Sequence, residues 1–420
     1  MMYYIPISDR AILLSLLPML SLSAGEFIIL IMRKKNLSKN FSDIDWNRKS
    51  FNLALMILGI LGLFSGMIMF LGSSITFGLP WNASDSQMKF LRATMGANAY
   101  FDKSIAFIIE YAVLLQGASF AGAMLSIVYA GYIPGPNKFL ICLPVIGTML
   151  FDLGWGGRSN TFFTILILIT GFFLIPKLRQ YSDVLRKRQF KNAFLSLLAG
   201  ILLMLAIHSI AKTGVEAKTL NIGGIEIPLS ISQLIDYHAG TLISFDKTLD
   251  NNQLTWGRMS FNGIELWLRF IRIIPNSFEA PQQLIDWERE SINIIDDQTW
   301  LRTLNTYSWL RYLYSDFDII GLIMIPFVIG IISGRSAISW VSRSNRKINA
   351  FIFLISSYCA ILASPTIMIF RDVRFVFALI LLYFSAIYIN KKSKYKNLNR
   401  KAIHYPERQI MTMYQTSPSK

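Results

Sequence analysis

The residues best suited to chemistry in this chain are arginines at the ends of apolar segments. Arg158 follows 3 glycines in the stretch GWGGRSN, Gly154–Asn160. Glycine lets a backbone bend and approach a ligand closely, and a guanidinium binds phosphate oxygens through two parallel hydrogen bonds. The pattern favours an anion site made by Arg158 with Gly156 and Gly157. A plain glycine-rich turn whose arginine reaches the lipid surface is the alternative.

More arginines lie in a long polar segment and in a short turn near the end of the chain. Arg269 and Arg272 are three residues apart and would share one face of a helix. Arg258 precedes them, and Arg371 and Arg374 lie together in FRDVRF. Several arginines on one side of a membrane suit an anionic lipid head group such as a pyrophosphate. Simple anchoring to lipid phosphate is the alternative for each of them.

The chain offers few candidates for a catalytic base. It has 3 histidines, of which His238 lies in the long polar segment beside Tyr237. A histidine there could orient or deprotonate a hydroxyl, although a lone exposed histidine more often has no such role. The stretch NTYSWLRYLYSDFDIIG, Asn305–Gly321, adds a carboxylate candidate, Asp316, close in sequence to Arg311.

Metal, cofactor and nucleic-acid chemistry have little support in the sequence. The 2 cysteines, Cys142 and Cys359, lie in apolar segments, which predicts packing roles and no disulfide or zinc site. No Walker A or dinucleotide fingerprint occurs, so we expect no cofactor. The net charge of +16 would suit nucleic acid. Lys and Arg gather in particular loops of a hydrophobic chain, however, as in membrane proteins, so nucleic acid is not an expected partner.

The elements that must position these residues are predicted to be membrane-spanning helices. Hydrophobic residues make up 53% of the 420-residue chain and charged residues only 16%, below the usual share of about a quarter. Apolar runs of about 18 residues or more with few charges indicate transmembrane helices. The sequence predicts nine: 11–32, 51–73, 105–130, 138–153, 161–176, 193–212, 318–341, 349–369 and 375–390. The fourth and fifth are short enough to be tilted, broken or only partly spanning.

The distribution of basic residues predicts how the chain crosses the membrane. Basic clusters lie in 33–50, in 177–192 and in the tail 391–420, whereas the segment 213–317 has more acids than bases. Lys and Arg favour cytoplasmic loops. We therefore expect the N-terminus and the segment 213–317 on the outside, and the C-terminus in the cytoplasm.

These spans divide the chain into four parts. They are an N-terminal transmembrane bundle (1–212), a large outward loop (213–317), C-terminal transmembrane helices (318–390) and a basic cytoplasmic tail (391–420). The loop contains Trp256, Trp267, Trp287 and Trp300, and apolar residues recur in it at helical spacing. Disordered segments lack such residues, so the loop is predicted to fold into short helices over the bundle. The expected fold class is all-α and polytopic.

Two motifs give the chain a family resemblance. GGRSN, 156–160, is similar to the glycine-glycine-arginine-serine turn of bacterial O-antigen and capsule repeat-unit polymerases (Wzy-type), and NTYSWLRYLYSDFDIIGLIMIPFVIG, 305–330, is similar to their late signature. The many spans, the single large loop and the basic tail match as well. Two features depart from the family. Its members often have ten or more spans, so 9–11 are expected here, and their Asp-Phe-Gly is Asp316-Phe317-Asp318 in this chain.

The resemblance implies a GT-C-like membrane glycosyltransferase of the ligase/polymerase type in the bacterial inner membrane. It would move a glycan from undecaprenyl pyrophosphate to a fresh lipid-linked repeat unit without a metal or cofactor. Arg158 would stabilise the leaving pyrophosphate, followed by Arg311 and then Arg258 or Arg371, and His238 or Asp316 would act as base. Other substrate contacts would come from Gly156, Gly157, Arg269, Tyr237 and Tyr314. Expected partners are the lipid-linked oligosaccharide, membrane lipids, a chain-length regulator and a flippase.

Other functions stay open at this point. An O-antigen ligase, which transfers the finished glycan to lipid A core, shares this architecture, and His238 alone matches its loop histidine motif weakly. A flippase or transporter usually has repeated halves and few large loops, whereas this chain has one large loop and no detectable repeat. A membrane protein without enzymatic activity is a further alternative.

Overall fold

The fold is known from a computed structural model, which describes part of the chain. The longer described stretches are 7–32, 47–77, 111–132, 136–155, 159–178, 309–341 and 372–391. Shorter ones are 219–222, 225–228, 292–293, 303–304 and 352–358, with short runs inside 242–273. Every structural statement below concerns these residues.

Long apolar helices dominate the described residues. They are α1 (Asp9–Met32), α2 (Arg48–Phe77), α5 (Gly117–Tyr132), α6 (Lys138–Trp155), α7 (Ser159–Leu178) and α12 (Trp309–Val341). A further helix, 373–391, follows near the end of the chain and is called the last helix here. Among the described residues, 5 helices are long and apolar enough to cross a membrane: Asp9–Met32, Arg48–Gly72, Tyr111–Ala130, Trp309–Ser339 and Val373–Lys391. The prediction of a helical multi-pass membrane protein is confirmed at this level.

The two predicted spans that looked short in the sequence are continuous helices. α6 has 18 residues and α7 has 20. At 1.5 Å per residue they measure about 27 Å and 30 Å, close to the hydrocarbon thickness of a bilayer. Pro144 lies inside α6 without ending it. The predicted span 193–212 lies outside the described residues, and 349–369 is described only as the helical stretch 352–358.

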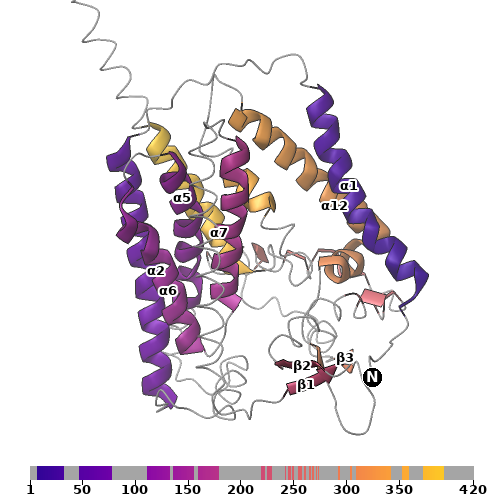
Figure 1. The fold of residues 1–420 in the computed structure, drawn as a ribbon, viewed down its shortest axis with the longest axis horizontal. Coiled ribbons are helices and arrows are strands. Elements are labelled where there is room, and N and C mark those ends of the chain that lie inside the picture. The colour runs from indigo at the N-terminus through magenta and orange to yellow at the C-terminus, as the bar shows by residue number, and fades with distance from the viewer. Residues whose placement is uncertain are drawn as a thin grey trace, which may run out of the picture.

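α1 and α12 form a parallel pair (Figure 1). Residue numbers rise together along the contact: the Ser21 hydroxyl donates to the carbonyl of Ile323 at 2.5 Å, and the Ser333 hydroxyl donates to Glu26 at 2.7 Å. Parallel packing agrees with the predicted crossings, which send both segments through the membrane in the same direction.

Glycines let the α1 and α12 backbones touch. A Cβ on Gly330 would lie too close to the Leu22 carbonyl oxygen for any residue with a side chain to fit there. Gly25 faces the Phe327 carbonyl of α12 in the same way. Gly330 and Gly334 are four residues apart, the small-residue spacing typical of close helix packing in membranes. Packing of small residues, more than hydrophobicity, therefore joins these two helices.

Replacing Gly330 by leucine is expected to separate α1 from α12 and destabilise the protein. The new side chain would meet backbone atoms, which cannot move aside as a flexible side chain can, and overpacking of this kind costs about 1–3 kcal/mol. Thermal unfolding in detergent measures the effect. Gly72→Leu is the matched control, because a Cβ at Gly72 meets nothing within 4 Å. Equal melting temperatures for the two variants would contradict the proposed contact.

The remaining described helices form a second group around a shared core. Buried residues of α2, α5, α6, α7, 352–358 and the last helix pack together there, and Ala337, near the end of α12, packs against them. α2 runs parallel to α6, since Gly59 meets Leu143 and Gly154 meets Phe70. It runs antiparallel to α5, since Gly62 meets Ser119 whereas Tyr129 donates to Asn52.

These directions bring one set of helix ends together. α6 ends where α7 and the last helix begin, because Asp152 and Arg374 both bond to Asn160. We call this side the rim end of the molecule. The relative directions agree with the predicted crossings, while the assignment of the rim end to the outside rests on the basic loops and stays a prediction.

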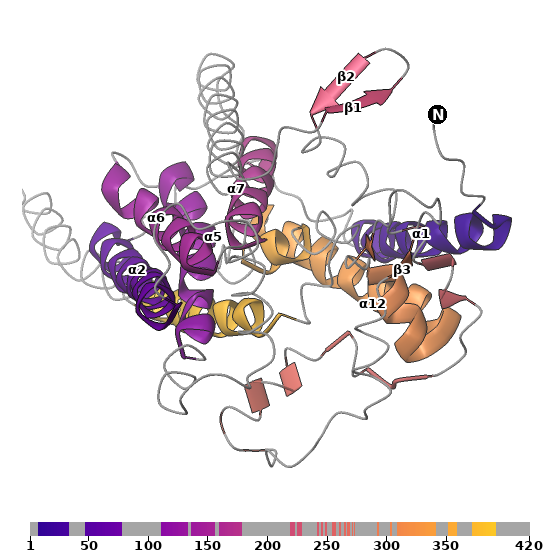
Figure 2. The same cartoon turned by 90° about the horizontal axis from the view of Figure 1, so that it is seen from below.

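The long loop contains strands as well as helical turns. β1 (Thr219–Ile222) pairs antiparallel with β2 (Ile225–Pro228), and β3 (Ile292–Asn293) pairs with β4 (Thr303–Leu304). Figures 1 and 2 show the two longer strands beyond the helices. Short helices were predicted for this loop from the sequence, and these strands were not. The signal was present, because TLNI-GG-IEIP places Gly-Gly between two runs rich in β-formers, a typical hairpin pattern.

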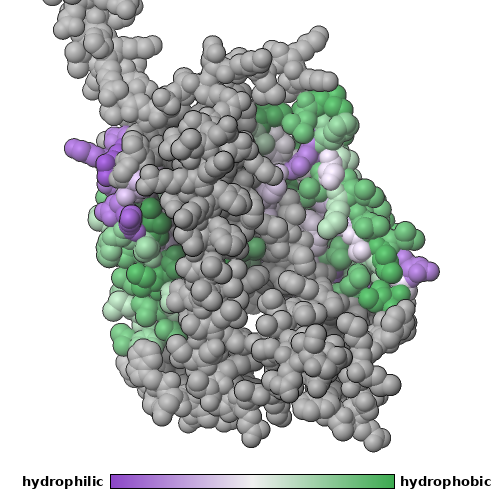
Figure 3. Space-filling model, in the orientation of Figure 1, coloured by the Kyte–Doolittle hydropathy of each residue, from purple (hydrophilic) through white to green (hydrophobic). Residues whose placement is uncertain are grey.

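The outer surfaces of the helices are apolar. α1 exposes large side chains along its length, among them Leu13, Met19 and Phe27, each at least 62% exposed. Figure 3 shows these surfaces in green over α1 and α2 on opposite sides of the molecule. An apolar belt of this size on a helical protein is expected to face lipid.

Candidate functional site

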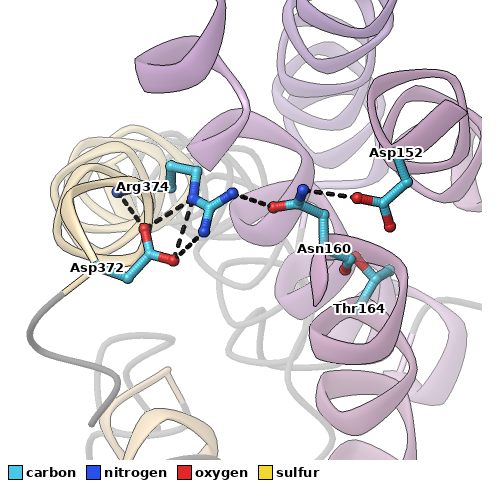
Figure 4. A network of polar contacts seen from close by, with 5 residues as sticks. All are labelled: Asp152, Asn160, Thr164, Asp372 and Arg374. Carbon is cyan, nitrogen blue, oxygen red and sulfur yellow. Dashed lines mark hydrogen bonds and ion pairs between the residues drawn. The ribbon is translucent and has the colours of Figure 1, made fainter. Parts of the chain in front are cut away.

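A buried polar network joins three helix ends at the rim end (Figure 4). We call its members the rim cluster: Asp152 from the end of α6, Asn160 and Thr161 from the start of α7, and Asp372 and Arg374 from the start of the last helix. Asp152, Asn160 and Thr161 are at most 3% exposed. Polar groups this deeply buried are costly unless their hydrogen bonds are made, so the network constrains where the three ends lie.

Asp152 stabilises the start of α7. One carboxylate oxygen accepts from the Asn160 side-chain amide at 2.7 Å, and the other accepts from the Thr161 backbone N–H at 2.6 Å. The first N–H groups of a helix have no partner inside it and carry partial positive charge. A carboxylate from α6 therefore caps α7 across the turn that connects the two helices.

Arg374 connects this cap to the last helix. Its Nε donates to both Asp372 oxygens at 2.8 Å and 3.0 Å, and its Nη1 donates to the Asn160 side-chain oxygen at 2.5 Å. Asp372 in turn accepts from the Arg374 backbone N–H at 2.9 Å and so caps the last helix. Asn160 thus lies between Asp152 and Arg374 and orients both.

A second polar arrangement lies at the start of α12, within the late signature. Arg311, Tyr314 and Asp316 are at most 4% exposed. The Tyr314 hydroxyl accepts from Arg10 of α1 at 3.2 Å, and its ring packs edge-on against Phe245 with centroids 5.8 Å apart. These residues therefore lie inside a junction between α1, α12 and the loop.

Asp316 connects α12 to one segment of the loop, which we call the strap. The strap comprises the described residues within 254–273. The two oxygens of Asp316 accept from the Thr255 hydroxyl and, at 2.6 Å, from the Ser260 backbone N–H. The Thr255 backbone N–H also donates to the Ser315 carbonyl at 3.0 Å. One buried carboxylate therefore positions the start of the strap on α12.

The strap continues from α12 to the last helix. Near its start, the Phe261 ring lies against the Phe317 ring with centroids 6.4 Å apart. Farther along, Trp267 packs on Phe377 with centroids 5.3 Å apart. Phe377 is one turn beyond Arg374 in the last helix. A connected set of contacts thus runs from Asp316 through the strap to Arg374 and Asn160.

α12 bends at Asp318, the residue at which the sequence predicted its span to begin. Asp318 has φ 54° and ψ −149°, and the helix starts earlier, at Trp309. This backbone region is almost restricted to glycine. The backbone here is therefore shaped for glycine, although the residue is an aspartate.

Replacing Asp318 by glycine is expected to stabilise the protein by about 1 kcal/mol, because the backbone strain of a residue with a Cβ is relieved. Asp318→Val should lower stability, since a β-branched side chain fits this conformation worst. Thermal unfolding of both variants measures the difference. The opposite order of melting temperatures would show that the Asp318 side chain, and not its backbone, decides stability here.

The structure describes three of the predicted site residues and brings them to one junction: Arg311, Tyr314 and Asp316. The others lie outside the described residues, namely Gly156, Gly157, Arg158, Tyr237, His238, Arg258, Arg269 and Arg371. The sequence reasoning missed Asp152, and it considered Arg374 without its partner Asn160. An acid in the last turn of an apolar helix, followed by an asparagine after the turn, was the available signal.

The helices and the rim cluster define the class of this molecule, a multi-pass membrane protein with buried polar groups gathered at one end of its helices. Comparison with known proteins does not narrow that class. No protein-family model matches the chain, and neither a curated protein nor a solved structure matches it.

Proposed function

We propose that the protein polymerises lipid-linked oligosaccharide repeat units on the outer face of a bacterial inner membrane. The donor would be a growing glycan on undecaprenyl pyrophosphate and the acceptor a single lipid-linked repeat unit. The product would be O-antigen, capsule or exopolysaccharide, and the architecture would be GT-C-like. Five apolar helices among the described residues and one long polar loop support this class of enzyme, and two motifs resemble its signatures.

One observation carries the proposal: the two motifs belong to a single connected polar and aromatic arrangement at the rim end. Asp316 of the late signature bonds the strap, and the strap contacts the last helix through Trp267 and Phe377. In that helix Arg374 bonds Asn160, the final residue of GGRSN. Two motifs about 150 residues apart in the sequence thus share one set of contacts, which supports a common site.

The proposed reaction is a direct glycosyl transfer. The acceptor hydroxyl oxygen bonds to the anomeric carbon of the donor glycan while the bond from that carbon to the pyrophosphate oxygen breaks. The hydroxyl proton passes to a base. The pyrophosphate oxygen takes the electron pair of the broken bond, and the pyrophosphate leaves attached to its lipid carrier. The transition state has oxocarbenium character, and negative charge grows on the leaving group. A fixed guanidinium at that oxygen lowers the barrier.

The residues divide between these tasks as follows. Arg158 directly precedes α7, whose start the rim cluster positions, and it is our first choice for the pyrophosphate. Arg311, Arg258 and Arg371 follow as further cations. Both oxygens of Asp316 already accept hydrogen bonds in a buried place, which favours a positioning role and leaves His238 as the candidate base.

Purified protein in vesicles with a synthetic lipid-linked repeat unit tests this function. A polymerase produces a ladder of longer glycans that stay on the carrier lipid, without any other acceptor. Transfer of the glycan from the carrier lipid to added lipid A core would identify a ligase. Movement of the repeat unit between leaflets without any ladder would identify a flippase. If neither a new glycan product nor movement of the repeat unit is detected, the polymerase, ligase and flippase activities are all excluded.

A further inference from the structure

The strap exposes large apolar side chains. Trp256 is 76% exposed and Ile273 is 67% exposed, and Leu254, Ile264 and Ile271 are each at least 40% exposed. A single exposed apolar residue is ordinary on a protein surface. Several within one short run of a water-facing loop are not, and such a surface usually contacts a partner or a membrane.

The contacts of the strap with α12 fix the depth of Trp256 relative to the membrane. Its neighbour Thr255 bonds Ser315 and Asp316, and its other neighbour, Gly257, lies against the Phe317 ring. Trp256 is therefore level with the last helical turn before the bend at Asp318.

That turn is expected to lie at the edge of the hydrocarbon. The part of α12 after the bend, 319–341, measures about 34 Å at 1.5 Å per residue, against about 30 Å of bilayer hydrocarbon. Directly after the bend, α12 exposes Ile320 at 69% and Met324 at 53% on its lipid-facing surface. The apolar surface of the strap is thus adjacent to a surface that already faces lipid.

The backbone of the strap presents Trp256 outward. Trp256 has φ 51° and Gly257 has φ 87°, so two successive residues adopt left-handed conformations. For glycine this is free of strain, but for a bulky residue such as tryptophan it costs about 1–3 kcal/mol. Thr255 and Ser260, on either side of this turn, both donate to Asp316.

We propose that the strap lies in the lipid interface at the rim end, with the Trp256 indole seated among the lipid head groups. Indole is enriched at this depth because its ring is apolar and its N–H finds a polar partner. The other exposed residues of the strap are aliphatic, which suits acyl chains and does not suit a sugar, for which aromatic faces would be needed. The strap thereby places Asp316 and the last helix directly at the membrane surface, whatever reaction the protein catalyses.

Spin labels on the full-length protein in vesicles of phosphatidylethanolamine and phosphatidylglycerol test the proposal. The background carries Cys142→Ala and Cys359→Ala. Trp256→Cys and Ile273→Cys in the strap are then made as separate single-cysteine variants. The introduced cysteine of each variant is labelled with a nitroxide. Ile320→Cys on α12 is the lipid-facing reference, and Lys391→Cys, at the exposed end of the last helix, is the water-facing reference. Collision rates with oxygen and with a water-soluble nickel chelate report depth.

The two strap labels are expected to collide more often with oxygen than with the nickel chelate, the reverse of the order at Lys391, and to lie shallower than Ile320. Nickel-chelate collisions at Trp256 equal to those at Lys391 would overturn the proposal. So would a Trp256 label that is shielded from both reagents, because protein would then cover it. The second strap probe, Ile273→Cys, gives the same decision if Trp256→Cys does not fold.

Discussion

Arg158→Ala should abolish the formation of long glycans while the protein remains in the membrane at its normal amount. The proposed leaving group is a pyrophosphate, and the barrier to its departure depends on positive charge fixed beside the breaking bond. Loss of one such preorganised contact typically lowers the rate by about 10²–10³-fold. Since elongation repeats this step for every unit added, the product should stop at one or very few repeats. The length distribution of the lipid-linked glycan measures the effect.

Two comparison variants test whether Arg158 acts through two parallel hydrogen bonds to a phosphate or through its positive charge alone. Arg158→Lys keeps the charge but cannot form two parallel bonds to a phosphate, so it should also be impaired. Arg335→Ala removes an exposed arginine near the far end of α12 and should leave the ladder unchanged. Full activity in Arg158→Lys would reduce the role to charge alone. Long chains in Arg158→Ala would remove this residue from the mechanism.

The membrane architecture was predictable because it depends on length and composition alone. A run such as 51–73 crosses a membrane whatever its neighbours are, and α2 covers it from Arg48 to Phe77. The start of α12 was not predictable in this way. Its first turns carry Arg311 and Asp316, which read as loop on any hydropathy scale, and they become helical because the junction with α1 and the strap buries them.

The rim cluster shows where sequence reasoning about a site ends. Asp152 and Asn160 are close in sequence, and their bond could have been suspected from that spacing. Arg374 is more than two hundred residues away, and its bond to Asn160 arises only because the last helix packs beside α5 and α7. Spacing predicts contacts along one helix or turn, whereas contacts between helices depend on packing that one sequence does not display.

Asp316→Asn is expected to detach the strap from α12 and to reduce both stability and glycan elongation. The buried carboxylate accepts from Thr255 and from the Ser260 N–H, and hydrogen bonds to a charged group contribute about 1.5–3 kcal/mol each. An amide has one accepting oxygen where the carboxylate has two, so one donor is left without its partner in a buried place. Thermal unfolding and the glycan ladder, measured on the same preparation, report the two losses.

The double variant with Thr255→Val distinguishes an anchor from a catalytic base. If Asp316 acts by anchoring the strap, Thr255→Val should reproduce much of the loss, and the double variant should lose less than the sum of the two single losses, because both remove the same contact. If Asp316 is the base, Thr255→Val should retain elongation while Asp316→Asn abolishes it without unfolding. Ser260→Ala is the matched control. It keeps the backbone N–H that Asp316 accepts from and removes a hydroxyl with no hydrogen-bond partner among the described residues, so stability should be unchanged or slightly higher.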